Sequence, residues 1–413
     1  MAQDDDVFSK DLPDFIEKVN RWYREDFEGF KTMYDAATAN VVPYPKDTPP
    51  ALHCDWKDKG VDFLCQFFED WYAWDPGVHN GLDYIEKFSW INYENAYGMV
   101  FVTCGPGHKV LADFTHLQGV LLDKKGDKRT QALIGAWVEQ LGSKMKDFES
   151  GPWETFNDFF VRELAKNARP ISAAKDDTVV VAPADCVINM IVDELKKDTP
   201  IPVKTVTMNV EQLLAGSSFA DTFVDGTAVS CILMPDSYHW YHAPVAGEVV
   251  EARDDIAGVY YGMRDFPELL NKGNVGYGYD YEMFDHFRRG YLIIKTRYPD
   301  GPHGEKQEGY VGMVTVGLNS IGSVNYLPRF QHVNYPAAPA TPKDPVKVGK
   351  GEKIGNFKYG GSLNILLFEK ERFPALQLLQ GQRIGLLEPK ERTRGLFTGS
   401  YHTQSRRRSP LAP

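Results

Sequence analysis

The sequence lacks several features that would place it in a class at once. It has only five cysteines, widely separated and without a Cys-x-x-Cys pair. A disulfide framework or zinc cluster is therefore not expected, and a reduced, cytoplasmic setting is favoured. No uninterrupted apolar segment reaches the roughly 20 residues that a membrane-spanning helix needs. The N-terminus, Met-Ala-Gln-Asp-Asp-Asp, is acidic, whereas a secretory signal begins basic and continues apolar.

Positive charge is also scarce. The 46 Lys and Arg residues are outnumbered by 57 Asp and Glu, which gives a net charge of −11. Binding to phosphate needs a basic surface, so we expect no nucleic-acid partner and no broad attraction to anionic lipid. Apolar residues make up 43% of the 413 positions, enough for the cores of two domains.

Residues 11–150 are predicted to form a helical N-terminal domain. Asp11 is a suitable helix N-cap, with Pro13 in the first turn. Apolar residues then recur at steps of three or four, as they do on amphipathic helices. These stripes cover residues 16–34, 61–72, 110–121 and 133–148, while residues 80–104 stay unassigned. Gly151-Pro152 is the predicted domain boundary.

Aromatic residues are concentrated in residues 63–74 of this domain. Such a group could form a box for an aromatic ligand. Helical spacing instead favours ordinary core packing, since buried aromatic side chains dominate protein cores.

Residues 151–388 are predicted to form a β-rich core, which makes the fold α+β. The apolar runs become short and are separated by turn residues, a pattern typical of strands. Residues 273–281, rich in glycine and tyrosine, form either a surface loop or the border of a pocket. Residues 317–322 are glycine-rich but lack the lysine of a phosphate-binding loop. Residues 1–10 and the basic tail, 389–413, are predicted to be disordered, although the tail could also carry a phosphorylation or partner site.

Three stretches of the β-rich core carry candidate catalytic residues. Asp185 lies in an apolar stretch, residues 179–188, that we predict to be a strand broken by Pro183. His239 and His242 stand three residues apart, and Ser362 follows two glycines. Serine is a poor nucleophile without a base, and an acid, a histidine and a serine together form a nucleophile, base and orienter set. Each residue has a simpler interpretation: a turn cap for Asp185, an inert turn for Ser362, and a metal pair for the histidines. A metal pair is disfavoured, because residues i and i+3 of a strand face opposite ways and no third ligand is evident.

The same stretches resemble the phosphatidylserine decarboxylase family of self-processing pyruvoyl enzymes. Pro183-Ala-Asp185 is similar to the family's Pro-Ala-Asp-Gly segment, with Cys186 in place of glycine. Tyr238-His-Trp-Tyr-His-Ala-Pro244 resembles its two-histidine motif. Gly360-Gly-Ser362 resembles its cleavage motif, with Leu363 where a small hydroxyl residue is usual. Residues 155–171 are similar to its entry helix, so the resemblance covers roughly residues 153–370, and the N-terminal extension looks like that of soluble fungal members, which include a tryptophan decarboxylase. The family's fold implies hairpins of the hybrid barrel-sandwich type at residues 244–251 and 346–355.

The resemblance implies a chemistry for these residues. His242, oriented by Asp185, would take the proton of Ser362, whose oxygen attacks the carbonyl of Gly361. The chain would then break between Gly361 and Ser362, and Ser362 would become a covalent pyruvoyl group, without metal or pyridoxal phosphate. A substrate amine would form a Schiff base with that group and lose CO₂. His239 would hold the substrate carboxylate or return a proton.

The sequence leaves three functions open. The first is decarboxylation of a soluble amino acid, which the acidic charge favours; the resemblance to the fungal tryptophan decarboxylase implies an aromatic one. The second is phosphatidylserine decarboxylation, which yields phosphatidylethanolamine. The third is a non-catalytic scaffold on a decayed decarboxylase fold, which the leucine at position 363 raises. The oligomeric state is also open, a homo-oligomer of two-fragment protomers being one arrangement.

Overall fold

A computed structural model describes most of the chain. The described residues are 8–44, 53–78, 80–81, 83–193, 195, 201–203, 206–256, 288–299, 307–317, 323–334, 344–360, 362–373 and 375–384. The glycine/tyrosine segment 273–281, residues 318–322 and the basic tail lie outside them.

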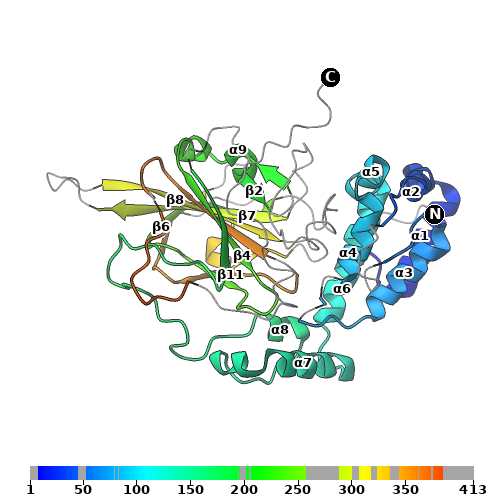
Figure 1. Ribbon diagram of the computed structural model, residues 1–413, viewed down its shortest axis with the longest axis horizontal. Helices are drawn as coiled ribbons and strands as arrows, with labels where there is room; N and C mark the ends of the chain where they lie inside the picture. Colours follow the sequence, from blue (N-terminus) through cyan, green and yellow to red (C-terminus); the bar gives the residue numbers. More distant parts are fainter. Residues whose placement is uncertain are drawn as a thin grey trace.

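The α+β prediction is confirmed, with helices in the N-terminal part and strands in the C-terminal part (Figure 1). The α-helices are α1 (Leu12–Glu25), α2 (Phe30–Ala39), α3 (Val61–Ala73), α4 (Asp83–Ser89), α5 (Ala96–Thr103), α6 (Gly105–Leu122), α7 (Lys128–Leu141), α8 (Phe156–Phe160) and α9 (Val210–Leu214). The strands are β1 (Val187–Val192), β2 (Ile201–Val203), β3 (Val206–Met208), β4 (Thr227–Leu233), β5 (Trp240–His242), β6 (Gly247–Ile256), β7 (Arg289–Tyr298), β8 (Gln307–Gly317), β9 (Asn325–Tyr326), β10 (Val346–Val348), β11 (Lys353–Asn356) and β12 (Ser362–Phe368).

The first predicted helical stripe is divided between two helices. Asp11 caps α1 as predicted, accepting a hydrogen bond from the backbone N–H of Asp14 at 3.0 Å. The helix ends because Asp26 adopts a left-handed conformation, with φ at 47°, and Gly29 does the same. The carboxylate of Asp26 then accepts a hydrogen bond from the backbone N–H of Thr32 in the first turn of α2. Periodicity alone does not reveal such a break, since the apolar spacing continues across it.

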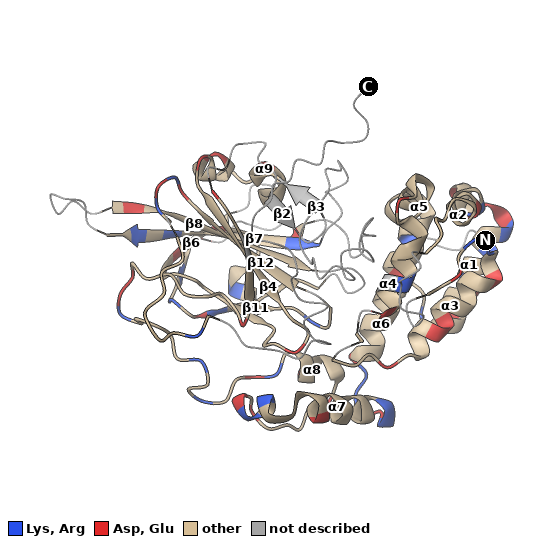
Figure 2. Cartoon of the chain, viewed as in Figure 1, with Lys and Arg blue, Asp and Glu red and all other residues tan. Residues whose placement is uncertain are grey.

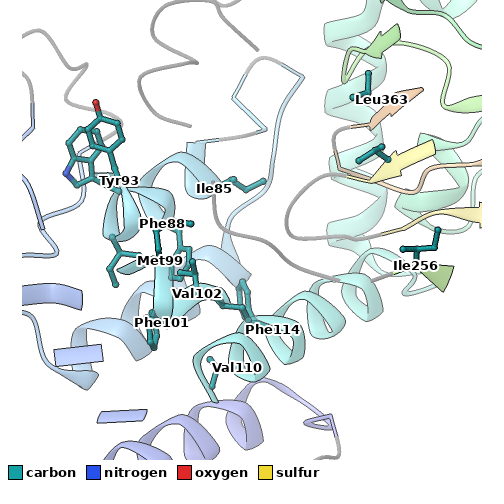
Figure 3. Close-up of a cluster of buried hydrophobic side chains, with 14 of the residues drawn as sticks. Ile85, Phe88, Tyr93, Met99, Phe101, Val102, Val110, Phe114, Ile256 and Leu363 are labelled. Atoms are coloured by element: carbon teal, nitrogen blue, oxygen red, sulfur yellow. The ribbon is translucent and has the colours of Figure 1, made fainter. Parts of the chain in front are cut away.

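The aromatic residues of α3 pack as a core, as the spacing predicted. Phe67, Phe68 and Trp71 are buried, and Phe68 lies 4.6 Å from Phe114 of α6 between ring centroids. These aromatic residues belong to a buried apolar cluster that extends into the β-rich part. Figure 3 shows its residues from the helices gathered around Phe88, Phe101 and Phe114, and its residues from the strands, such as Leu363, on the other side. The segment that the sequence left unassigned contains α4 and α5, which supply several of these side chains.

A seven-stranded antiparallel sheet, in the order β1-β4-β12-β8-β7-β6-β10, forms the centre of the C-terminal part. Strand β12 lies between β4 and β8 and is buried along its whole length. Its side chains alternate between two cores. Leu363 and Ile365 lie in the first core, which includes the aromatic residues of α3, and Leu366 and Phe368 lie in the second core. Figure 2 shows that charged residues lie mainly at strand ends, on loops and on helix surfaces. Because β12 is paired on both sides and buried along its length, the strand that begins at Ser362 is held rigidly.

A small sheet, β5-β11-β9, packs against the large one through the second core. The two segments predicted as hairpins, residues 244–251 and 346–355, contact each other because β10 pairs with β6. Strand β11 of the second segment pairs with β5, which precedes the first segment. This arrangement carries the histidine segment alongside the segment that precedes Ser362.

The strand predicted at residues 179–188 is wrong over most of its length. Residues 179–186 contain no strand, and β1 begins only at Val187. The segment still runs beside the histidine stretch, because the backbone N–H of His242 donates to the Pro183 carbonyl at 2.7 Å. Proline provides no N–H of its own for a ladder, which explains why regular pairing does not develop there.

Helices α7 and α8 connect the two parts of the molecule, and Figure 1 shows them below both. Trp137 of α7 packs with Phe156, Phe159 and Phe160 of α8 in a third buried cluster, and Tyr359 lies against it. The segment just before Ser362 therefore meets the helices.

Candidate active site

Ser362 occupies the first position of β12 and is buried, with 1% of its surface exposed. Its neighbours across the ladder are Leu233 on β4 and Gly317 on β8. Gly360, two residues earlier, has a φ of 143°, a conformation that residues with a Cβ rarely adopt. Gly361 lies outside the described residues. The sequence thus places a buried hydroxyl directly after a turn that requires glycine.

His239 is the histidine that contacts Ser362. Its Nδ1 lies 3.4 Å from the Ser362 Oγ, and its Nε2 lies 3.3 Å from the carbonyl oxygen of Pro235. A carbonyl can only accept, so Nε2 carries the ring hydrogen and donates it to Pro235. The lone pair of Nδ1 therefore points toward the serine hydroxyl, the tautomer that accepting its hydrogen requires.

The surroundings of His239 keep its imidazole neutral. The side chain is completely buried, and its ring stacks on that of Phe160 with 4.0 Å between centroids. Burial, assisted by the positive charge of Arg162, lowers the pKa of His239 to about 3. At neutral pH the ring is therefore a hydrogen-bond acceptor and not a cation.

Arg162 places a buried positive charge beside this histidine. Its guanidinium lies 4.0 Å above the ring of Phe148, and its Nη2 donates to the Asp236 carbonyl at 3.4 Å. Burial lowers the pKa of Arg162 to about 10, so the side chain stays charged at neutral pH. Its Nε has no hydrogen-bond partner among the described residues. The carboxylates of Asp236 and Asp185 partly offset its charge, and the unused Nε–H is a donor of the kind that a carboxylate ligand binds.

His242 does not contact Ser362, which corrects the predicted pairing. Its Nδ1 lies 2.7 Å from the carbonyl oxygen of Gly351, and its Nε2 lies 3.0 Å from the hydroxyl of Tyr238. Nδ1 therefore donates to Gly351, and Nε2 accepts from Tyr238. Burial lowers the pKa of His242 as well. Histidines three apart on an extended segment face opposite ways, so only one of them can face β12.

Asp185 is held by an arginine and not by a histidine. Its two carboxylate oxygens accept from Arg169, at 2.9 Å from Nε and 2.8 Å from Nη2. Arg169 also donates to Asp147 at 2.9 Å. The predicted chain of hydrogen bonds from Asp185 through His242 to Ser362 is thus not formed in this structure, although all three segments lie in the same region.

The two departures from the motifs have structural explanations. Cys186 does not adopt a positive φ, so its Cβ causes no backbone strain. Leu363 is completely buried between Ile232 of β4 and Val316 of β8, and Figure 3 places it on the sheet side of the first core. The leucine therefore fills the apolar face of β12 that points away from the second core.

Sequence reasoning gave no role to Phe160, Arg162, Tyr238 or Tyr359. The first three lie within motifs that resemble the family and Tyr359 directly precedes one, but their contacts cross between distant segments and leave no local pattern. Within the described ranges, no three His, Cys, Asp or Glu side chains gather as metal ligands, and no helix combines the length and apolarity needed to cross a bilayer.

Comparison with known proteins identifies the family. A model of the phosphatidylserine decarboxylase family matches residues 156–387, more than half of the chain. The chain belongs to the phosphatidylserine decarboxylase family. It is therefore an enzyme of the pyruvoyl-dependent decarboxylase class, a carbon–carbon lyase, and the predicted family is confirmed.

Three relatives indicate how far the similarity extends. A phosphatidylserine decarboxylase proenzyme of Fusobacterium nucleatum is 28% identical over 282 residues, 68% of this chain and 80% of the relative. One of Anoxybacillus flavithermus is 29% identical over 262 residues, 62% of this chain and 82% of the relative. Phosphatidylserine decarboxylase proenzyme 2 of Oryza sativa is 29% identical over 282 residues, 68% of this chain but only 39% of the relative. The family match begins within α8, so helices α1–α7 precede it.

Proposed function

We propose that this chain is a proenzyme that cuts itself between Gly361 and Ser362 and then converts phosphatidylserine to phosphatidylethanolamine. The observation that carries the proposal is the buried Ser362 hydroxyl facing the neutral Nδ1 of His239 at the start of a rigid strand. The serine stands in the position of the family's cleavage motif. The names of the relatives support the substrate.

In the proposed self-cleavage, the Ser362 oxygen attacks the Gly361 carbonyl carbon and the peptide C–N bond breaks, leaving an ester. Elimination releases the Gly361 carboxylate and leaves a double bond in residue 362. Addition of water with loss of ammonia then converts residue 362 to a pyruvoyl group. The products are residues 1–361 and residues 362–413.

Two histidines are candidates for the base in this step. His239 has the contact with Ser362, but its strongly lowered pKa makes it a weak proton acceptor. His242 was predicted for this role; burial lowers its pKa as well, and reaching Ser362 requires it to leave Tyr238 and Gly351. Self-cleavage rates of His239→Gln and His242→Gln assign the role, since the base variant remains uncut.

In turnover, the pyruvoyl group supplies an electron sink for the pair released with CO₂. The residues around it perform the remaining work. His239 adjoins position 362 and is the proposed group that handles the proton returned to the substrate carbon. Arg162 supplies the nearby buried positive charge that attracts the substrate's anionic end. Phe160 covers the imidazole and keeps water away from it.

The choice between substrates rests on a direct comparison. Purified enzyme is given phosphatidylserine vesicles and, separately, tryptophan, tyrosine, phenylalanine and serine, and CO₂ is measured. The proposal expects CO₂ from the vesicles. Release only from a free aromatic amino acid would replace phosphatidylserine with the substrate favoured by the sequence.

Self-cleavage is tested on denaturing gels with mass spectrometry. Wild type should give two fragments, the smaller with a pyruvoyl end, and Ser362→Ala should give one chain. An uncut wild-type chain that releases no CO₂ would instead support the scaffold function.

A further inference from the structure

The segment just before the proposed cut is held partly by α8, where the family match begins, and partly by residues that precede that match. The backbone N–H of Tyr359 donates to Oδ1 of Asn157 at 3.0 Å, and the Tyr359 hydroxyl donates to the Gly81 carbonyl at 3.0 Å. Residues 357–360 are named the cleavage loop here. Its tyrosine thus reaches back across most of the chain to the turn before α4.

Aromatic packing reinforces these hydrogen bonds. The Tyr359 ring lies edge-on to Trp137 of α7, with 6.1 Å between centroids, and to Phe156 and Phe160 of α8, at 5.5 and 5.3 Å. Burial raises the pKa of Tyr359, so its hydroxyl remains a donor throughout the neutral range. A Cβ added to Gly81 would lie 2.8 Å from that hydroxyl, which shows how close the approach is.

Asp123, the C-cap of α6, accepts hydrogen bonds both from Asn157 and from Lys358 of the cleavage loop. Its Oδ1 accepts from Nδ2 of Asn157 at 2.9 Å, and its Oδ2 accepts from Nζ of Lys358 at 2.6 Å. A carboxylate can only accept, so the Asn157 amide is fixed with Oδ1 directed to the Tyr359 N–H. Asn157 is buried, which limits alternative arrangements.

We propose that the N-terminal helices act as a clamp on the cleavage loop, with Asp123 and Tyr359 as positioning residues for self-cleavage. The inference rests on the proposed function. Two glycines separate Tyr359 from Ser362, and glycine has the largest backbone freedom of any residue. Anchoring Tyr359 on one side, while β12 fixes Ser362 on the other, restricts the carbonyl between them to the neighbourhood of the hydroxyl. The rate of an intramolecular reaction rises steeply when the two reacting groups are held close together in the right orientation.

The β-rich core holds the start of the same loop, with the Phe357 ring buried in the second core 4.7 Å from the ring of Tyr241 between centroids. The Phe357 N–H donates to the His239 carbonyl at 3.0 Å, and the Lys358 N–H donates to Oγ of Ser323 at 3.3 Å. Both act before Tyr359. The side-chain contacts of Tyr359 itself come from α7, α8 and the turn at Gly81, so the helices are the anchor nearest to the cut.

The test uses the full chain with two readouts. The first is the rate of self-cleavage in Asp123→Ala and in Tyr359→Phe, which loses only the hydroxyl. The second is hydrogen exchange at the Tyr359 amide in an uncleavable Ser362→Ala background. The matched control is Lys125→Ala, which removes the exposed ion pair with Glu154 two residues from Asp123 without touching the loop.

We expect Asp123→Ala to slow cleavage about tenfold and Tyr359→Phe about threefold. Hydrogen exchange at the Tyr359 amide should become faster in proportion. Lys125→Ala should change neither the cleavage rate nor the exchange rate. Normal cleavage in both variants, whether or not exchange increases, would overturn the clamp and leave the proposed function standing. If the wild type itself never cleaves, the proposed function fails and the clamp fails with it. Urea unfolding of the Ser362→Ala forms shows whether a variant is merely unfolded.

Discussion

The Oγ of Ser362 lies 3.4 Å from Nδ1 of His239, although 123 positions separate the two residues in the chain. Both side chains are buried, and the imidazole is held in the tautomer that accepts the serine hydrogen. This pair, at the start of the interior strand β12 and beneath Phe160, forms the centre of the site.

Replacement of His239 should impair turnover. In His239→Gln the neutral ring beside position 362 is lost, and general acid–base catalysis by a positioned side chain contributes roughly 10²–10⁴-fold. We expect decarboxylation per cleaved chain to fall at least about 100-fold. The rate is measured as CO₂ release normalised to pyruvoyl content, so that slow self-cleavage is not mistaken for slow turnover. Undiminished turnover per pyruvoyl group would remove His239 from the mechanism.

Acid should destabilise the folded chain through the same histidine. Its pKa is about 3 when folded and near 6.5 when unfolded, so the unfolded state binds more protons between these values. Stability is therefore present above pH 6.5 and is lost as the pH falls toward 3. Between pH 7 and 5 the loss due to His239 is about 2 kcal/mol.

Urea unfolding of Ser362→Ala, with and without His239→Gln, measures this contribution. The pH dependence should be flatter by that amount in the double variant. A control with the exposed His53 replaced by Gln should retain the full dependence. Equal slopes in all three proteins would show that His239 binds its proton equally in the folded and unfolded states.

Replacement of Leu363 by the family's small hydroxyl residue should weaken the fold. The leucine is completely buried, so Leu363→Thr leaves a void and buries a hydroxyl. Leucine truncations of this kind cost about 2–5 kcal/mol, and the hydroxyl adds to the cost. Urea unfolding in the Ser362→Ala background measures the loss. Leu363→Ile, which conserves volume, should cost less than about 1.5 kcal/mol. Equal stability of the threonine form would mean that the core tolerates the family's usual residue.

Asn364 offers a stabilising change. Its side chain is buried between Cys231 and Thr315, and neither Nδ2 nor Oδ1 has a partner among the described residues. An unsatisfied buried polar group costs about 1–3 kcal/mol, so the similarly sized Asn364→Leu should raise the free energy of unfolding by about that amount. Urea unfolding in the uncleavable background checks it. A fall in stability would reveal a polar partner for the amide, such as a buried water.

The sequence by itself determined the kind of protein. Helical periodicity located α3, α6 and α7, the change to short apolar runs indicated the β-rich part, and the order of motifs indicated the family. These features depend on neighbours within one or two turns, or on short segments, so they can be followed along the chain. The exceptions were local too: left-handed residues divided the first helical stripe at Asp26, and Pro183 kept residues 179–186 out of the sheet.

The tertiary structure alone decided which side chains meet. The sequence does not distinguish the two histidines of one motif as partners for Ser362. The direction in which the backbone presents each side chain made His239, and not His242, the neighbour of Ser362. Asp185 turned toward Arg169, and Tyr359 reached Gly81, 278 positions away. Contacts at such separations depend on how sheets and helices pack in three dimensions, and spacing along a chain does not contain that information.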